Sequence, residues 1–370
     1  MILSEWTEGN RHKGGVMKFG HFLFHTNMDP SKDAEAIQDA LSEAKLAEEL
    51  EYDAVWFSEH HFSGEVVYAD PLIFGSAVAA QTKKILLGMA VVELALNNPV
   101  RVAIQTSVID NVSQGRLLVG VARGSIYSAF EFRGFGTDVT EAIARTEESE
   151  ELLIKAWTTE DGLEYDGKYW QVAFPRIRPR PYQKPHPPLI RAGVSNETVA
   201  AMGKIGRPVM LRTTSADHAR EQITLYKESM LSAGFDDAAV EKNLDLCWIW
   251  RDVYVAETTE QALDEFRSGF EHYEDTLAGI RERWSPPDQP VVTRVGRMLD
   301  GSVNQTDKLD SSQVSQITVG SAKHVKDRFI ELKDAGVRNV LLTHRGRVVT
   351  KEQGRNSMRL LAEQVFPSLK

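Results

Sequence analysis

Short apolar segments alternate with longer amphipathic segments along most of the chain, and this alternation limits the possible folds more than any other feature. We expect strands at residues 19–24, 54–57, 85–94, 117–122, 189–193, 209–211, 246–255 and 340–343. Apolar residues at helical spacing predict helices at residues 33–50, 71–80, 100–111, 141–158, 197–204, 216–233, 260–273, 325–335 and 356–365. Strands separated by helices predict a parallel sheet that helices cover. About eight such strands favour a closed (β/α)8 TIM barrel over an open doubly wound sheet.

The length and the segment pattern also predict how the chain is divided. The 370 residues, 42% of them hydrophobic, suffice for one large core. Because the segment that begins at Met17 resembles a second natural start, we expect residues 1–16 to be an N-terminal extension and residues 17–370 a single domain. Residues 285–315 break the alternation and are rich in Pro, Asp, Gln, Ser and Gly. Loops this long in a compact domain are usually lids or disordered segments, and we take this one as a candidate lid.

The composition excludes several classes of partner. The formal net charge is −10, with 43 basic and 53 acidic residues, which disfavours nucleic acid because phosphate binding needs a basic face. No apolar run reaches the roughly 18 residues of a membrane span, and the start of the chain has no apolar signal core. The one cysteine, Cys247, cannot form an intramolecular disulfide or a cysteine metal cluster. We therefore expect a cytoplasmic protein without a nucleic-acid or membrane partner.

The sequence Glu59-His60-His61-Phe62 follows directly after an expected strand. In an α/β barrel, the carboxyl ends of the strands are where the chemistry takes place. A histidine there can act as a general base near neutral pH, and adjacent residues point in different directions, so one of the two faces the pocket. Both histidines could equally be hydrogen-bonded scaffold residues. A zinc site is disfavoured, because no third ligand stands at motif spacing.

Two further strand ends carry groups that suit an anion. Arg123-Gly124 follows the strand at 117–122, and a guanidinium offers a planar fork of donors. Ser195 and Thr198 stand at the start of the expected helix 197–204, where free backbone N–H groups bind phosphate. A surface salt bridge and an ordinary helix cap are the alternatives. No Gly-x-Gly-x-x-Gly follows a strand, and no P-loop or Gly-x-Ser-x-Gly segment is present.

These motifs, in this order, resemble those of the bacterial luciferase and alkanal monooxygenase family. Residues 59–62 resemble the Glu-His-His-Phe signature of that family, and residues 114–124 resemble its glycine-arginine segment. Residues 178–189 resemble its proline-rich lead into the phosphate-binding strand. The resemblance covers the chain from about Met17 to Pro367, and it implies the same barrel.

The resemblance also implies roles for particular residues. His60 matches the catalytic base beside the flavin, and Arg123 matches the arginine that binds the FMN phosphate. Ser195 and Thr198 match the hydroxyl groups on that phosphate, with the backbone of Val194 beside them. Ala90-Val91 falls where the family has a non-proline cis peptide under the isoalloxazine ring.

The activity that the resemblance implies is an FMN-dependent monooxygenation. Reduced FMN and O₂ would form a carbon-4a peroxyflavin that oxygenates a small organic substrate of the aldehyde, ketone or terpene class. The reduced FMN would come from a separate NAD(P)H-flavin reductase, and the protein would form a homodimer. Ala122 replaces a reactive cysteine of light-emitting members, and Val194 replaces an acidic residue, so we expect no luminescence.

Other functions remain open at this stage. One is a hydride-transfer oxidoreductase of the same superfamily that uses FMN or a deazaflavin, and another is a non-catalytic flavin-binding protein. A metal-dependent barrel hydrolase would need more strand-end ligands than His60 and His61. Phe24, Trp56 and Phe62 are candidate pocket residues, together with Trp250, although packing in the barrel core would explain each of them equally well.

Overall fold

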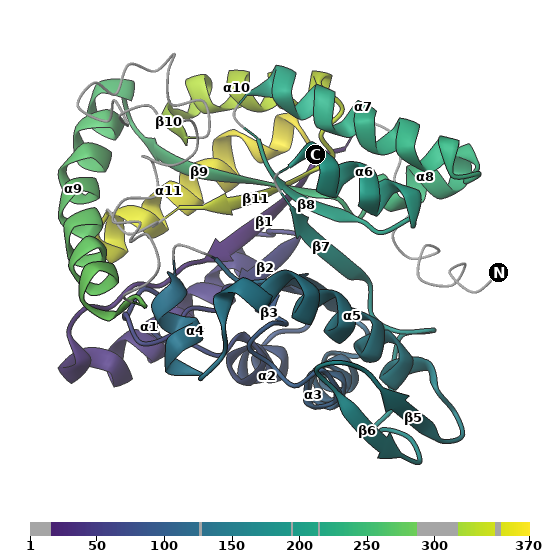
Figure 1. Cartoon of the computed structure of the whole chain (residues 1–370). Coiled ribbons are helices and arrows are strands. Elements are labelled where there is room, and N and C mark those ends of the chain that lie inside the picture. The colour runs from purple at the N-terminus through teal and green to yellow at the C-terminus, as the bar shows by residue number, and fades with distance from the viewer. Residues whose placement is uncertain (1–15, 126–127, 194, 214, 287–316, 345–348) are drawn as a thin grey trace.

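The computed structural model describes residues 16–125, 128–193, 195–213, 215–286, 317–344 and 349–370. Within these residues the expected barrel is confirmed (Figure 1). Eight parallel strands are hydrogen-bonded in the order β1-β2-β3-β4-β7-β8-β9-β11, and β11 pairs with β1 to close the ring. These strands are β1 (Lys18–Leu23), β2 (Ala54–Phe57), β3 (Leu86–Glu93), β4 (Leu117–Ala122), β7 (Leu189–Gly193), β8 (Val209–Arg212), β9 (Trp248–Ala256) and β11 (Asn339–Thr343).

The helices lie around the outside of the barrel (Figure 1). Several begin with the caps that their sequences predict; Asp70 and Asn98, for example, each accept two backbone N–H bonds before a proline at the first helical position. The helices are α1 (Asp33–Glu49), α2 (Pro71–Gln81), α3 (Pro99–Ser113), α5 (Ala142–Thr158), α6 (Asn196–Lys204), α7 (Ala216–Ser232), α9 (Thr259–Trp284), α10 (Ala322–Asp334) and α11 (Lys351–Gln364).

Some elements were not expected from the sequence. The helices α4 (Ala129–Gly134) and α8 (Asp237–Leu244) are too short to show a clear apolar period. The hairpin β5 (Leu163–Asp166) with β6 (Gln171–Phe174) is mostly polar, and β10 (Ile317–Ser321) pairs with β9 beyond the part of β9 that pairs with β11. The helix α9 runs well beyond the expected residues 260–273. All of these elements lie outside the eight-stranded ring.

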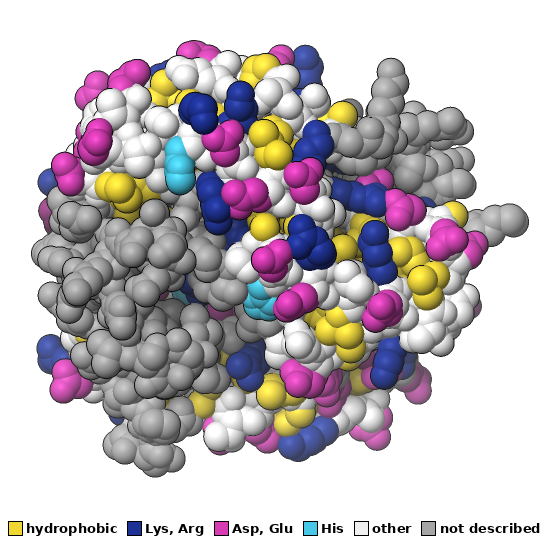
Figure 2. Space-filling view, turned by 90° about the horizontal axis from the view of Figure 1, so that it is seen from above, with side chains coloured by type: hydrophobic (Ala, Val, Ile, Leu, Met, Phe, Trp, Pro, Cys, Tyr) yellow, Lys and Arg dark blue, Asp and Glu magenta, His cyan; other side chains and the backbone are white. Residues whose placement is uncertain are grey.

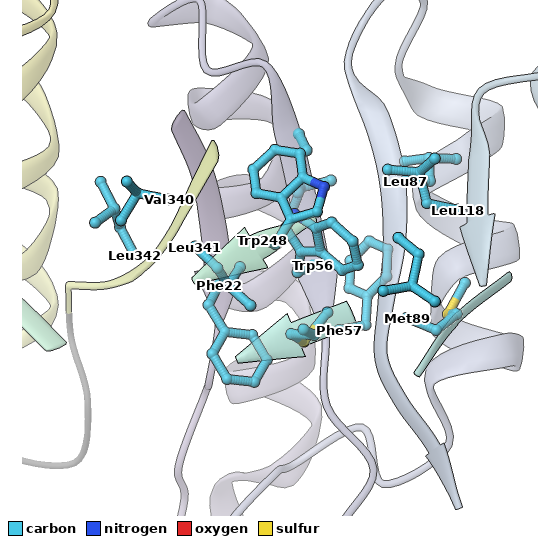
Figure 3. Packing of buried hydrophobic residues seen from close by; sticks show 14 of the residues in the cluster. Phe22, Trp56, Phe57, Leu87, Met89, Leu118, Trp248, Val340, Leu341 and Leu342 are labelled. Atoms are coloured by element: carbon cyan, nitrogen blue, oxygen red, sulfur yellow. The ribbon is translucent and has the colours of Figure 1, made fainter. Parts of the chain in front are cut away.

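The interior of the barrel is filled by two large aromatic side chains. Trp56 from β2 and Trp248 from β9 point toward each other with ring centroids 5.0 Å apart (Figure 3). Glycines on both strands beside β2 make room for Trp56. A Cβ atom at Gly20 would lie 2.6 Å from the Trp56 ring, and one at Gly88 would lie 2.1 Å from it. Trp56 is therefore part of the close-packed core and not of a pocket.

The described part of the chain shows neither a surface patch of one charge in Figure 2 nor a membrane-spanning helix. Basic and acidic side chains are intermixed on the face seen in Figure 2. Among the described residues, no helix is both long enough and apolar enough to cross a membrane. The expected extension at residues 1–16 and the expected lid at residues 285–315 lie outside the described residues, except at their edges.

Candidate functional site

Four neighbouring strands bring the expected site residues to one end of the barrel. His60 follows β2, Arg123 follows β4 and Ser195 follows β7, while the cis peptide lies within β3. Because β2, β3, β4 and β7 are parallel and adjacent, their carboxyl ends meet at the same rim. The structure therefore gathers residues that lie far apart in the sequence, as expected. Val194 lies outside the described residues.

His60 is held by a carboxylate that the sequence did not reveal. Its Nδ1 atom lies 3.2 Å from Oε1 of Glu131, a residue of α4 with no exposed side-chain surface. The other oxygen of Glu131 accepts the backbone N–H of His61 at 3.1 Å. The His60 ring also packs edge-on against Phe24, with centroids 5.7 Å apart. These contacts fix the ring and make Nδ1 the nitrogen that donates to Glu131.

The surroundings of His60 favour its protonated form. Burial alone would lower the pKa of His60, but negative charge nearby opposes this effect. The charge of Glu65 and the hydrogen bond and charge of Glu131 raise the pKa to about 9, with a smaller contribution from Glu93 where that carboxyl is ionised. This shift favours the imidazolium form of His60 at neutral pH. A group in that form can donate a proton, whereas the family resemblance implies a base at this position.

His61 has a different partner and faces elsewhere. Its Nε2 atom lies 3.0 Å from Oε1 of Glu59. Glu59 also accepts the backbone N–H of Glu93 at 2.8 Å and the side-chain amide of Asn97 at 2.9 Å. Glu59 and His61 thus tie the end of β2 to the end of β3. The scaffold interpretation fits His61, and the functional one fits His60.

The Ala90–Val91 peptide bond of β3 is cis, as the family resemblance implies. It falls at the point where the pairing of β3 with β4 shifts its register, between Met89 and Val92. Ala90 and Val91 are both partly exposed, whereas Met89 and Val92 on either side are buried. The backbone at these two residues is therefore reachable from the mouth of the barrel.

The expected anion site combines a guanidinium with a helix start. Among the described residues, the partly buried Arg123 has no hydrogen-bond or ion-pair partner. The last pair between β4 and β7 joins Val121 to Arg191, so Arg123 stands level with the turn that leads to Ser195. The Ser195 Oγ atom caps α6 by accepting the Thr198 N–H at 3.3 Å, and it lies 3.2 Å from Thr198 Oγ1. An arginine without a partner in the described part of the chain, next to a capped helix start on the neighbouring strand, suits a phosphate.

One feature of this helix start opposes an anion. Glu197 lies in the first turn of α6, fully exposed, and its pKa is lowered by its own backbone N–H and by the Ser195 side chain. Gly193 lets the turn pack closely, because a Cβ atom there would lie 2.5 Å from the Thr198 methyl group. Because the carboxylate of Glu197 is exposed, it can turn toward solvent, and the backbone N–H groups at the start of α6 then stay accessible to a phosphate.

Two acidic residues of the site were missed by sequence reasoning. Glu93 ends β3 and is 3% exposed, and its single charge in an otherwise apolar strand was the available signal. Glu131 sits between two phenylalanines on a short helix, 71 residues away from His60 in the sequence. Nothing in the sequence links these two segments, so only the folded chain reveals the pair.

The candidate pocket residues divide into three groups. Trp56 belongs to the barrel core, as shown above. Phe24 touches His60, and it leads through Phe22 to Trp250 with ring centroids 5.7 Å and 6.0 Å apart. Phe62 is 64% exposed at the surface. An aromatic row therefore runs from His60 to Trp250; Phe22 and Phe24 are buried in it, and Trp250 is partly buried.

His60, Glu93 and Glu131 each offer one oxygen or nitrogen atom, and these atoms lie within 4.8 Å of one another. A divalent cation would need an uncharged imidazole and two ionised carboxylates here. The high pKa of His60 opposes that state. Flavin binding is the better fit, because the anion site and the cis peptide lie on the same rim.

Residues 17–339 match the family model described as luciferase-like monooxygenase. The chain belongs to the luciferase-like monooxygenase family. This result confirms the resemblance seen in the sequence motifs.

Individual relatives and solved structures agree with this assignment. The chain is 29% identical over 232 residues to the alkanal monooxygenase alpha chain of Photorhabdus laumondii, which covers 62% of this chain and 63% of that relative. It is 24% identical over 362 residues to limonene 1,2-monooxygenase of Rhodococcus erythropolis, with 95% and 87% covered. The chain thus spans less than two thirds of the alkanal monooxygenase.

The fold is shared with solved structures. A monooxygenase from Streptomyces bottropensis superimposes with a TM-score of 0.75 at 24% identity, covering 96% of this chain and all of that one. The oxygenating constituent of a 3,6-diketocamphane monooxygenase from Pseudomonas putida, solved with FMN, gives the same TM-score at 19% identity, with 96% and 99% covered.

Proposed function

We propose that this protein is an FMN-dependent monooxygenase that oxygenates a small organic substrate with O₂ and does not emit light. The observation that carries the proposal is the rim that β2, β3, β4 and β7 form. On this rim lie a histidine bonded to a buried carboxylate, a cis peptide, and an arginine without a partner among the described residues, beside a capped helix start. Family membership supports the same reaction class.

Each group on the rim has a task in this proposal. Arg123, Ser195 and Thr198 bind the FMN phosphate through charge-assisted and neutral hydrogen bonds, with the backbone of Val194 beside them. Ala90 and Val91 offer a backbone surface to the flavin ring. Reduced FMN, when bound, supplies the electrons that activate O₂. The residues of the chain orient the cofactor and keep water out of the site.

His60 supplies or receives the proton of the reaction. Because its pKa is about 9 in the free protein, His60 begins as a donor at neutral pH. The imidazolium can neutralise negative charge that develops next to it, and Glu131 holds the ring in place meanwhile. His60 then regains a proton before the next turnover. The proposal therefore requires only that the fixed ring of His60 loses and regains one proton in each turnover.

The aromatic row supports an apolar substrate. Phe24, Phe22 and Trp250 lead away from His60, and Trp250 is the partly buried member of this row. A ketone, an aldehyde or a terpene would bury its hydrocarbon surface against the accessible part of Trp250, with the buried rings of Phe22 and Phe24 behind it. The names of two relatives, which act on an alkanal and on limonene, agree with this class.

We further propose two kinds of partner. A separate NAD(P)H-flavin reductase would provide reduced FMN; the name of one relative, the oxygenase component of a trigonelline monooxygenase, supports such a division. A second copy of the chain would cover exposed apolar residues on the adjacent helices α2 and α3, which are Ile73, Ile104, Val108 and Val112.

The alternative is hydride transfer with a deazaflavin. An F420-dependent secondary alcohol dehydrogenase shares the fold with a TM-score of 0.71 at 17% identity. Both cofactors carry a phosphate, so the anion site does not separate them. The higher TM-score of the diketocamphane monooxygenase solved with FMN, 0.75 against 0.71, favours FMN.

Anaerobic titration with photoreduced FMN, followed by rapid mixing with oxygenated buffer, tests the proposal. We expect the reduced FMN to bind and the spectrum of oxidised FMN to appear later than it does in free solution. Immediate reoxidation with tight binding would indicate the hydride-transfer alternative. Failure of reduced FMN to bind would contradict the flavin assignment.

A further inference from the structure

Glu93 is a buried acid for which the chemistry above has no use. It is the last residue of β3, and its Oε2 atom is buried without a hydrogen-bond partner among the described residues. A buried ionised oxygen without a partner is costly, whereas a protonated carboxyl is not. Because Glu93 lies next to His60 and Glu131, its unpaired oxygen could take part in proton transfer at this site.

The space around this carboxyl is shaped by a glycine. Gly124, with φ of +86°, follows the expected phosphate arginine. A Cβ atom at position 124 would lie 3.1 Å from Glu93 Oε2 and 2.9 Å from the ring of Phe132. The left-handed turn thus leaves room for the carboxyl on the side of the FMN phosphate site. Glu93 stands between this turn and His60.

The charge balance of the cluster requires one carboxyl to be neutral. Glu131 is bonded to His60, and each of these residues has an atom within 4.8 Å of a Glu93 oxygen. Two buried carboxylates so close together are not both ionised beside a single positive charge. Burial first, and then the charges of Glu131, Glu59 and Glu65 against the opposing charge of His60, raise the pKa of Glu93 well above its ordinary value.

We propose that Glu93 holds a proton as a carboxylic acid and acts as a positioning residue that returns this proton to His60 during turnover. When His60 gives up its proton, the O–H bond of Glu93 breaks and an N–H bond forms on His60. Glu93 is then a carboxylate, and the cluster has lost one proton in total. A proton from water later returns Glu93 to the carboxylic acid. No electrons change place in this step. The inference rests on the proposed role of His60.

Infrared spectroscopy of the flavin-free protein tests this inference directly. We expect a carbonyl band of a protonated carboxyl at pH 7, absent in the Glu93→Gln variant. In Glu160→Gln, whose side chain is 87% exposed, the band remains. Absence of the band from the unchanged protein, or its presence in Glu93→Gln, would overturn the proposal. One equivalent of tightly bound Zn²⁺ in the protein as purified would also overturn it, because the cluster would then hold a cation.

A second measurement separates this role from a merely structural one. Nuclear magnetic resonance of labelled histidine should show the His60 titration nearly unchanged in Glu93→Gln, because a neutral amide then replaces a neutral carboxyl. Turnover should nevertheless fall about tenfold in Glu93→Gln, because the amide has no proton to return to His60. A His60 titration that moves well downward in Glu93→Gln would show that Glu93 is ionised and would overturn the proposal, and so would full turnover in this variant. Because the spectra need no flavin, they stay decisive even if FMN does not bind, which would defeat the proposed function alone.

Discussion

The interior of the barrel and its carboxyl rim are built from the same strands but follow opposite rules. In the interior, Trp56 fills the space that Gly20 and Gly88 leave open, and its ring packs against that of Trp248. A few residues further along β2 and β3, buried acids surround His60. The contrast teaches that the packed interior stabilises the barrel, which allows the rim to hold charges that would otherwise destabilise it.

The largest effect should follow from emptying the interior. Trp56→Ala removes a fully buried ring and leaves a cavity, so we expect the free energy of unfolding to fall by about 3–5 kcal/mol. Trp284→Ala, at a side chain that is 54% exposed, should change it by less than about 0.5 kcal/mol. Denaturant titration measures both. Equal effects would show that Trp56 is not a core residue.

Removal of the histidine on the rim should affect turnover most. His60→Ala should lower turnover by roughly 10²-fold, and it should also lower stability because the buried Glu131 loses its partner. His61→Ala should lower turnover by less, because its ring binds Glu59. Steady-state kinetics with reduced FMN and a responsive substrate measures both. Full activity in His60→Ala would contradict a role for His60 in proton transfer.

Loss of the phosphate arginine should weaken cofactor binding. Arg123→Ala should cost about 1.5–3 kcal/mol of FMN binding, as expected for a lost charged hydrogen bond. Arg101→Ala, on the exposed face of α3, should leave the dissociation constant unchanged. Calorimetric titration compares them. An unaltered constant for Arg123→Ala would place the phosphate elsewhere.

The state of His60 should also set a pH limit. Because its folded pKa of about 9 is above that of an unfolded histidine, its ion pair stabilises the fold fully below about pH 6.5. This contribution is lost as the pH rises through about 9. Turnover that needs the proton should fall about tenfold per pH unit above that value. Glu131→Gln should move the fall to lower pH, and an unchanged profile would contradict the pairing.

The smallest effect concerns the helix start. Ser195→Ala removes the cap of α6 and one phosphate donor, so we expect a loss of about 1 kcal/mol in stability. Ser215→Ala, which removes the matching cap of α7, should cost a similar amount of stability but leave FMN binding unchanged. Binding that falls equally in both variants would remove Ser195 from the phosphate site.

The same contrast explains what could be predicted from the sequence. The ring of strands was predictable, because strands such as β2 and β4 are apolar runs bounded by turns. His60 and Arg123 were predictable as site residues, because they directly follow the carboxyl ends of these two strands. Glu131 was not predictable, because a short helix has no period and its partner lies in another segment. The raised pKa of His60 needs the folded arrangement of Glu65 and Glu131, since no local pattern encodes charges from separate segments that converge on one ring.

The measurement that tests the account most directly is a competition between cofactors at this rim. Reduced FMN and the reduced deazaflavin should be titrated anaerobically into the protein and into Arg123→Ala. The account predicts that reduced FMN binds at one site per chain, at least about tenfold more tightly than the deazaflavin, and that Arg123→Ala loses this binding. Tighter binding of the deazaflavin, or equally tight FMN binding in Arg123→Ala and the unchanged protein, would contradict the account.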